Sequence, residues 1–202
     1  MTKLRASAVV LAAAVSTAAL SGCAGALIGA GAGAGSAAAQ ERGLEGALSD
    51  TKIRAEINDL WLRRDFDMYR KVDLNILEGR VMLTGVVKTD QARAEAVRLT
   101  WQAAGVKEVY NEIEVVPDGE GFAGFSRDTW IQEKLNTKLL LDKEIQSINY
   151  VIDVVHGVVY VMGIAQSQEE LDRVLAYARD ISDVQRVVNH VLVKTDPRRV
   201  SG

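Results

Sequence analysis

The sequence predicts an α+β protein made of two tandem α-β-β-α-β domains, each a three-stranded sheet covered by two helices. The first observation is a repeated segment, Gly-Arg-Val-Met-Leu-Thr-Gly at 79–85 and Gly-Val-Val-Tyr-Val-Met-Gly at 157–163. The second is that the match continues on both sides at a constant offset of about 78 residues, as expected of an internal repeat. Asp50 falls on Asp128 in this register. Unrelated segments would not keep one register through a helix, a hairpin and a further strand.

Each repeat begins with a predicted amphipathic helix. In the first repeat, Asp50 or Thr51 is the expected N-cap. Apolar residues then recur with helical spacing at Ile53, Ile57, Leu60 and Trp61. The second repeat has the same pattern at Ile131, Leu135 and Leu139.

Two strands and their turn follow the first helix. Alternating apolar residues predict a strand at 72–76, a turn at Glu78-Gly79 and a partner strand containing Val81 and Leu83. The corresponding strands of the second repeat are expected at 151–155 and 158–162. Alternation with a period of two predicts that one face of each strand is buried.

A second helix and a third strand complete each repeat. In the first repeat the helix is expected over about 90–104 with Gly105 as its C-cap, and the last strand contains Val109, Ile113 and Val115. The second repeat has helical spacing from Leu171 to Ile181 and a strand at 187–193. The predicted domains are therefore 49–116 and 127–194, with a Gly-containing linker at 117–126 and a tail at 195–202.

The N-terminus has the features of a lipoprotein signal. Lys3 and Arg5 precede an uncharged, Ala-rich run, which predicts a signal peptide over 1–22. The run ends in Leu-Ser-Gly before Cys23, which resembles the bacterial lipobox and implies lipidation of that cysteine. Cys23 is the only cysteine of the chain, so it cannot form an internal disulfide.

An Ala/Gly-rich segment follows Cys23. We expect a flexible tether over 23–48, since few bulky side chains are present to offset the cost of ordering the chain. The alternative is a short apolar segment resting on the membrane. Ala24 after the acylated position implies, by resemblance to enterobacterial lipoproteins, an outer-membrane, lipid-anchored protein on the periplasmic face.

Composition and motifs argue against several function classes. A net charge of −3 disfavours a nucleic-acid partner. No HExxH, P-loop, GxSxG or cysteine cluster is present, so we expect a non-enzyme with no cofactor, metal or catalytic residues. His156 and His190 correspond to glutamates of the first repeat, and we expect them to be solvated turn and strand residues.

The pattern resembles the BON domain. The residues that carry it are Gly79, Val81, Leu83, Gly85, Gly105, Val106, Val109, Asn111, Ile113 and Val115, and in the second copy Gly157, Val159, Val161, Gly163, Val184, Val187, Asn189, Val191 and Val193. The second copy departs by having Asp183 in place of a glycine. With a lipobox, the chain resembles the dual-BON outer-membrane lipoproteins that support envelope integrity. That resemblance implies binding of anionic phospholipid through the first helix of the second domain.

The two copies differ most on this first helix. Trp130, Lys134, Lys138 and Leu141 replace Lys52, Glu56, Leu60 and Arg63. On a helix the four lie within a wedge of roughly 80°. Tryptophan, leucine and lysine on one exposed face are typical of a surface that contacts lipid.

Two alternatives stay open. Trp130 could instead pack between the two copies, and Leu140 and Leu141 could be ordinary core or interface residues. The rival function is a non-catalytic protein-interaction module that docks onto outer-membrane assembly proteins, through the same helix face or an exposed sheet edge.

Overall fold

The computed structural model describes residues 39–117 and 124–199. The expected signal peptide, Cys23, the tether up to residue 38, linker residues 118–123 and tail residues 200–202 lie outside the described residues. One compact unit, Ala34–Gly202, contains both repeats. All contacts described below lie within it.

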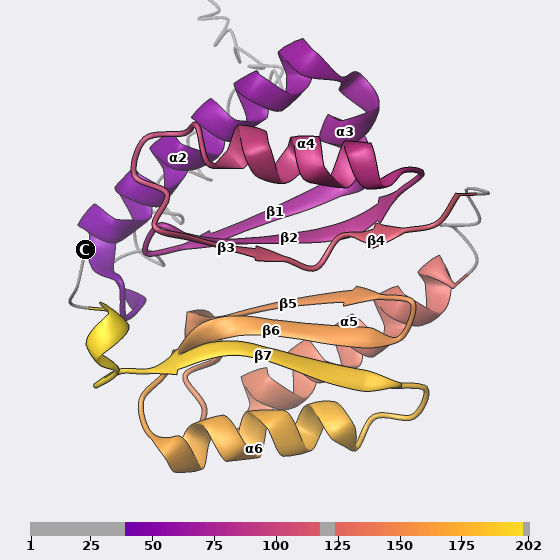
Figure 1. Ribbon diagram of the computed structural model, residues 1–202. Coiled ribbons are helices and arrows are strands. Elements are labelled where there is room, and N and C mark those ends of the chain that lie inside the picture. Colours follow the sequence, from indigo (N-terminus) through magenta and orange to yellow (C-terminus); the bar gives the residue numbers. More distant parts are fainter. Residues whose placement is uncertain (1–38, 118–123, 200–202) are drawn as a thin grey trace, which may run out of the picture. The chain divides into compact units, whose positions relative to one another are not determined.

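The predicted α+β class and the tandem repeat are confirmed (Figure 1). The first domain consists of α2 (Gly43–Arg64), α3 (Phe66–Lys71), β1 (Val72–Leu77), β2 (Arg80–Val87), α4 (Asp90–Thr100), β3 (Glu108–Asn111) and β4 (Glu114–Val115). The second consists of α5 (Phe125–Leu141), η1 (Ser147–Asn149), β5 (Tyr150–Val155), β6 (Val158–Ala165), α6 (Gln168–Arg179) and β7 (Arg186–Val193), followed by η2 (Pro197–Arg199).

Both sheets have the same topology. β1 and β5 pair antiparallel with β2 and β6, respectively, through two-residue hairpins. The third strand, which is β7 in the second domain, runs parallel to the central one. In the first domain it is interrupted, and β3 and β4 each pair with β2. The helices cover one face of each sheet (Figure 1).

The hairpin turns explain why glycine recurs after Glu78 and His156. All four turn residues have positive φ, 55° and 77° at Glu78-Gly79 and 48° and 77° at His156-Gly157. Positive φ at both central positions matches the twist of the flanking strands. A Cβ atom on Gly79 would also lie 2.6 Å from the carbonyl oxygen of Gly105, so a side chain cannot be accommodated.

The first helix starts earlier than expected, and Asp50 is not its N-cap. Helix α2 begins at Gly43, so the expected tether over 23–48 does not reach residue 48. The Asp50 carboxylate instead accepts hydrogen bonds from the backbone N–H groups of Glu78 and Gly79, both at 2.9 Å. Asp50 thus fixes the helix to the hairpin turn, a tertiary role that helix-capping rules do not reveal.

The residues just before α2 contact the second domain. Gln40 Nε2 donates to the carbonyl oxygen of Ile148 at 3.2 Å, and the Glu41 N–H donates to Asn149 Oδ1 at 2.8 Å. The Arg42 guanidinium bonds to Asp50 at 2.5 Å. These contacts order the end of the segment that the sequence analysis assigned to the tether.

Helix α4 is shorter than its sequence pattern suggests. It ends at Thr100, and Gly105 lies in the loop before β3 with φ of 92° rather than at the helix C-cap. Trp101, just beyond the helix, is exposed. The apolar spacing up to Ala103 persists because this loop still packs Ala103 into the core of the first domain.

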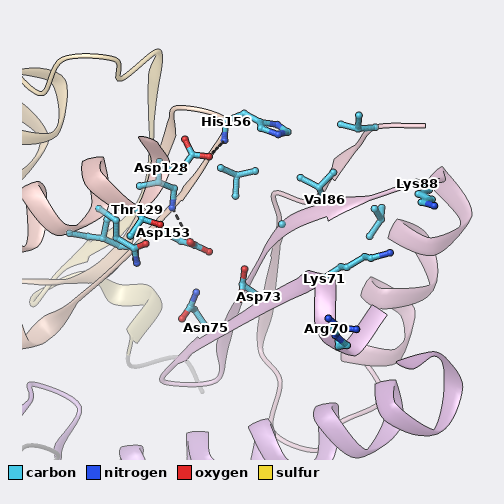
Figure 2. A pocket seen from close by; sticks show the side chains of 17 residues that line it. Arg70, Lys71, Asp73, Asn75, Val86, Lys88, Asp128, Thr129, Asp153 and His156 are labelled. Atoms are coloured by element: carbon cyan, nitrogen blue, oxygen red, sulfur yellow. Dashed lines mark hydrogen bonds between the residues drawn. The ribbon is translucent and has the colours of Figure 1, made fainter. Parts of the chain in front are cut away.

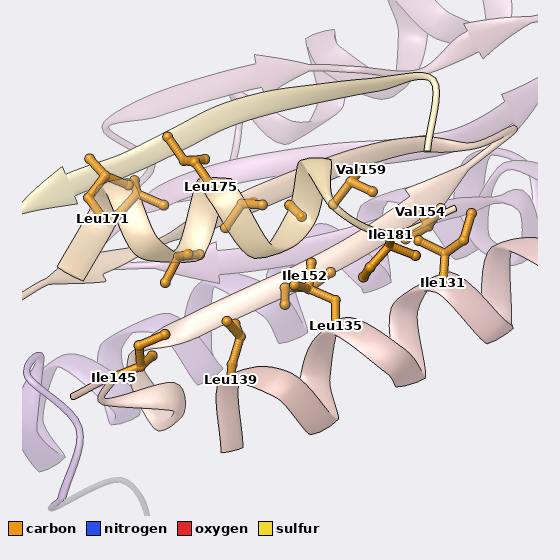
Figure 3. Packing of buried hydrophobic residues seen from close by; sticks show 14 of the residues in the cluster. Ile131, Leu135, Leu139, Ile145, Ile152, Val154, Val159, Leu171, Leu175 and Ile181 are labelled. Carbon is orange, nitrogen blue, oxygen red and sulfur yellow. The ribbon is translucent and has the colours of Figure 1, made fainter. Parts of the chain in front are cut away.

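Each domain has its own apolar core between helices and sheet. In the second domain, Ile131, Leu135 and Leu139 of α5 meet residues of the sheet and of α6 (Figure 3). The equivalent cluster of the first domain is built on Ile53 and Ile57.

A third apolar cluster joins the two sheets on the faces that the helices leave uncovered. Its buried members are Leu77, Met82, Val155, Val158, Tyr160, Met162 and Ile164. Every residue of β6 is consequently buried. The expectation of one buried face per strand is therefore wrong for β6, because the second face is covered by the other domain.

Polar side chains also connect the domains, and both histidines take part. His156 Nδ1 lies 2.7 Å from Glu114 Oε2, and His190 Nε2 lies 2.8 Å from Glu112 Oε1. The His190 ring stacks on Tyr110 with centroids 4.0 Å apart. The expectation that the histidines are simply solvated is therefore wrong, since their partners come from the other domain.

Candidate membrane-docking surface

Helix α5 is held rigidly on the second domain. The Asp128 carboxylate accepts hydrogen bonds from the backbone N–H groups of His156 and Gly157, at 2.8 and 2.9 Å. Gln132 Nε2 donates to the carbonyl oxygen of Ile152 at 2.8 Å. Ile131 and Leu135 are fully buried beneath the helix (Figure 3). These attachments fix which face of α5 meets solvent.

The outward face of α5 exposes large apolar side chains. Trp130 is 45% exposed, and Leu140 and Leu141 are 73% and 74% exposed. Trp130 is not a member of the buried cluster that joins the two sheets. Leu140 and Leu141 are likewise not core residues. We call Trp130, Lys134, Lys138 and Leu141 the α5 strip.

The structure brings Trp130 and Lys134 together. The Lys134 ammonium nitrogen lies 4.4 Å from the centroid of a Trp130 ring, within the range of a cation–π interaction. The pair holds the indole and the positive charge at one place on the surface.

Lys138 turns toward α6 instead. Its ammonium donates to Asp180 Oδ2 at 2.8 Å and lies 5.2 Å from the Tyr177 ring centroid. The Lys138 hydrogen bond and charge, with the charge of Lys134, lower the pKa of Asp180. Asp180 is well exposed, and exposed ion pairs contribute only about 0–1 kcal/mol. Lys138 can therefore exchange this partner for another anion at small cost.

Leu140 is a surface residue that the sequence analysis did not assign to the strip. It points away from the core, and Leu62, its equivalent in the first domain, is also exposed. The spacing of the buried α5 residues could have predicted that Leu140 is exposed, because a residue directly after buried Leu139 lies about 100° around the helix from it.

The same helix face of the first domain has different chemistry. Lys52 is exposed, and Arg63 pairs with Asp59 at 2.9 Å. Glu56 accepts a hydrogen bond from the backbone N–H of Ala104, and Leu60 packs against the domain core. No aromatic residue occupies the equivalents of the α5 strip.

Within residues 39–117 and 124–199, no group of three or more His, Cys, Asp or Glu side chains could hold a metal ion. None of the helices in this part of the chain has the length and apolar character needed to cross a bilayer.

The sequence matches the BON domain family at residues 49–117 and 127–195. The chain therefore belongs to the BON-domain family, and it carries two BON domains in tandem. We refer to them below as the first and second BON domains.

Three relatives illustrate the membership. An uncharacterized protein in the gshII 5′ region of Anaplasma centrale is 38% identical over 127 residues, covering 63% of this chain and 84% of its own length. Outer membrane lipoprotein DolP of Haemophilus influenzae is 27% identical over 171 residues, covering 84% of this chain and 87% of its own length. Osmotically-inducible protein Y of Escherichia coli is 27% identical over 150 residues, covering 73% of this chain and 74% of its own length.

Proposed function

We propose that this protein is a non-catalytic, lipid-anchored envelope protein that docks on anionic phospholipid through α5 and supports outer-membrane integrity. Cys23 carries the anchor, and the protein faces the periplasm. The proposal draws support from the similarity to the outer membrane lipoprotein DolP. The observation that carries it is the exposure of Trp130 and Leu141, with Lys134 beside Trp130, on the solvent-facing side of α5.

The α5 strip has the composition of an interfacial helix face. Indole side chains favour the headgroup boundary, where their apolar body and polar N–H are both accommodated. Leu141, and Leu140 beside it, can enter the region of the upper acyl chains. The Lys134 ammonium can stay with lipid phosphates while its stem lies along the apolar surface.

The expected affinity of α5 alone is modest. Each lysine near an anionic membrane contributes about 1 kcal/mol. Full burial of a large apolar side chain contributes about 1.5–3 kcal/mol, and docking buries only part of each exposed residue. A lipid anchor removes most of the translational entropy cost of docking α5 on the membrane, because it keeps the domain close to the bilayer. The anchor would provide residence, and α5 would select the lipid surface.

Co-sedimentation with vesicles tests the docking helix. The soluble chain should begin at Ala34, the start of the compact unit, because Gln40 and Glu41 contribute contacts to the second domain. We expect binding to vesicles that contain phosphatidylglycerol, weaker binding to purely zwitterionic vesicles, and release by added salt. Trp130→Glu should lower binding about tenfold or more, since it removes the indole and places a negative charge on the strip.

The first BON domain supplies a matched control. Trp101 is 51% exposed, so Trp101→Glu changes the same residue type and the same charge at similar exposure. It should leave vesicle binding unchanged. Equal loss in both variants would show a general charge effect, and no binding by the unmodified chain would contradict docking through α5. Retention of a protein partner in detergent, without anionic lipid, would favour docking onto outer-membrane assembly proteins.

A further inference from the structure

A cavity of about 650 Å³ opens where the two BON domains meet (Figure 2). Its walls come from β1, the end of β2 and the end of α3 in the first domain, and from β5 and the start of α5 in the second. This volume is within the range of about 300–1,000 Å³ that is common for small-molecule sites. The α5 strip does not line it.

Two carboxylates from different domains meet in the cavity. Asp73 of β1 and Asp153 of β5 lie near each other (Figure 2). Thr84 donates its hydroxyl hydrogen to Asp153. Among residues 39–117 and 124–199, no hydrogen-bond donor or cation reaches the Asp73 carboxylate. Partial desolvation, and then the Asp153 charge, raise the pKa of Asp73 to about 6. A positive group placed here would relieve the repulsion between the two carboxylates.

The cavity also has a cationic side. Arg70, Lys71 and Lys88 line it from the first domain, on the side away from Asp153 (Figure 2). Lys71 pairs with Asp67 at 2.9 Å. Lys88 is exposed and forms no salt bridge within the described part of the chain.

Apolar side chains separate the two charged ends. Val86 lies between Asp153 and Lys88, and Val116 and Val155 also line the cavity (Figure 2). The separation explains why Lys88 does not neutralise the two acids. A ligand that satisfies both ends must therefore carry charges of both signs.

We propose that this cavity binds a small zwitterionic group, with its ammonium at Asp73 and Asp153 and its phosphate or carboxylate at Lys88 and Lys71. An ammonium has three N–H donors for the carboxylate oxygens, and such charge-assisted hydrogen bonds are stronger than neutral ones. A simple anion would leave the acids uncompensated, and a simple cation would leave Lys88 unpaired. The headgroup of a zwitterionic phospholipid and a free zwitterion share this chemistry, and the experiment below distinguishes the two sources.

The site is a product of domain pairing and does not depend on the α5 proposal. Asp73 and Lys88 correspond to Val151 and Gln166 in the second BON domain, so the repeat does not duplicate it. Asp73 belongs to the first BON domain and Asp153 to the second, so a ligand bound between them would contact both domains.

Calorimetric titration of the chain from Ala34 with glycerophosphoethanolamine tests the proposal. We expect saturable binding at pH 7.5, and binding about tenfold weaker or undetectable with glycerophosphoglycerol, which lacks the ammonium, and with ethanolamine, which lacks the phosphate. Asp73→Asn and Lys88→Gln should each lower affinity about tenfold, as loss of a charge-assisted contact does. Both residues are exposed, so these substitutions should keep the fold.

The controls separate the possible sources and the possible failures. Lys143→Gln, an exposed lysine outside the cavity, should bind normally. Binding to phosphatidylethanolamine vesicles that exceeds binding to phosphatidylglycerol vesicles, and that Asp73→Asn abolishes, would assign the site to a lipid headgroup. Binding of glycerophosphoethanolamine without binding to the vesicles would assign the site to a soluble zwitterion. Absence of binding to both, or equal binding of glycerophosphoglycerol, would overturn the proposal. Binding of the free compounds does not bear on α5, because they offer no membrane surface. The vesicle comparison uses Trp130→Glu as background, so that docking through α5 does not contribute to it.

Discussion

The two BON domains make the same contacts where their first helices meet the sheet and carry different residues where those helices meet solvent. Asp50 and Asp128 each accept two backbone N–H groups of a hairpin turn. Arg54 and Gln132 each donate to a carbonyl oxygen of an edge strand, of Leu74 and Ile152, respectively. The inner contacts are constrained by the shared fold.

The outer faces are less constrained by the shared fold, although Glu56 accepts a hydrogen bond from the backbone N–H of Ala104. A solvent-facing position can change with little effect on stability, and there the second domain carries Trp130 and Lys134 where the first carries Lys52 and Glu56. The shared fold accounts for the inner contacts that the two domains have in common. A function specific to one domain is therefore expected at the outer positions where the two differ. Four predictions test this division.

The largest effect is expected in the cores. Ile57→Ala and Leu135→Ala occupy equivalent positions, and both side chains are fully buried. Each should lower the free energy of unfolding by about 2–5 kcal/mol, through lost burial and the cavity left behind. Urea unfolding monitored by circular dichroism measures this. A loss below about 1 kcal/mol at either position would contradict the equivalence of the two cores.

Removal of the helix–hairpin aspartates should have the next largest effect. Asp50→Ala and Asp128→Ala each leave two backbone N–H groups of a turn without their acceptor, at a cost of about 1–3 kcal/mol per buried group. Thermal unfolding should show lower melting temperatures for both variants. If Asp50→Ala alone were destabilising, the two aspartates would not have the same role.

A transfer of the α5 strip to the first domain tests the difference between the outer faces. The triple substitution Lys52→Trp, Glu56→Lys and Arg63→Leu gives α2 the chemistry of α5 on an exposed face. We expect affinity for anionic vesicles to rise about tenfold, because a second Trp, Lys and Leu face is added. Co-sedimentation measures this, with Trp130→Glu as background. No gain in that background would show that α5 needs more than these side chains.

The smallest effect concerns Asp73, a carboxylate without an equivalent in the second domain. Its pKa is raised to about 6, so the folded protein holds this proton more tightly than the unfolded chain does. Its contribution to stability is present below about pH 4 and is lost as pH rises to about 6. Since Asp73 is exposed, solvent screening limits the loss to about 1 kcal/mol.

Asp73→Asn removes this titration. The melting temperature of the unmodified chain should therefore fall relative to that of the variant between pH 4 and pH 6. A constant difference across that range would show that Asp73 titrates normally. The comparison between the two proteins cancels the contributions of other carboxylates.

The tandem repeat, the α+β class and the buried face of each main helix could be predicted from the sequence alone. Alternation with a period of two and helical spacing report directly which side of an element is buried, and the repeat supplies each pattern twice. The same spacing predicted that Ile131, Leu135 and Leu139 occupy the buried face of α5, but it left open whether Trp130 packs between the two copies.

The contacts between the two domains could not be predicted from the sequence. The start of α2 at Gly43, the pairing of both histidines with glutamates and the burial of both faces of β6 all depend on contacts between residues far apart in sequence. Local periodicity reports one buried face and cannot reveal a second that another domain covers. The cavity that contains Asp73 and Asp153 has the same origin, because its two acids come from different domains.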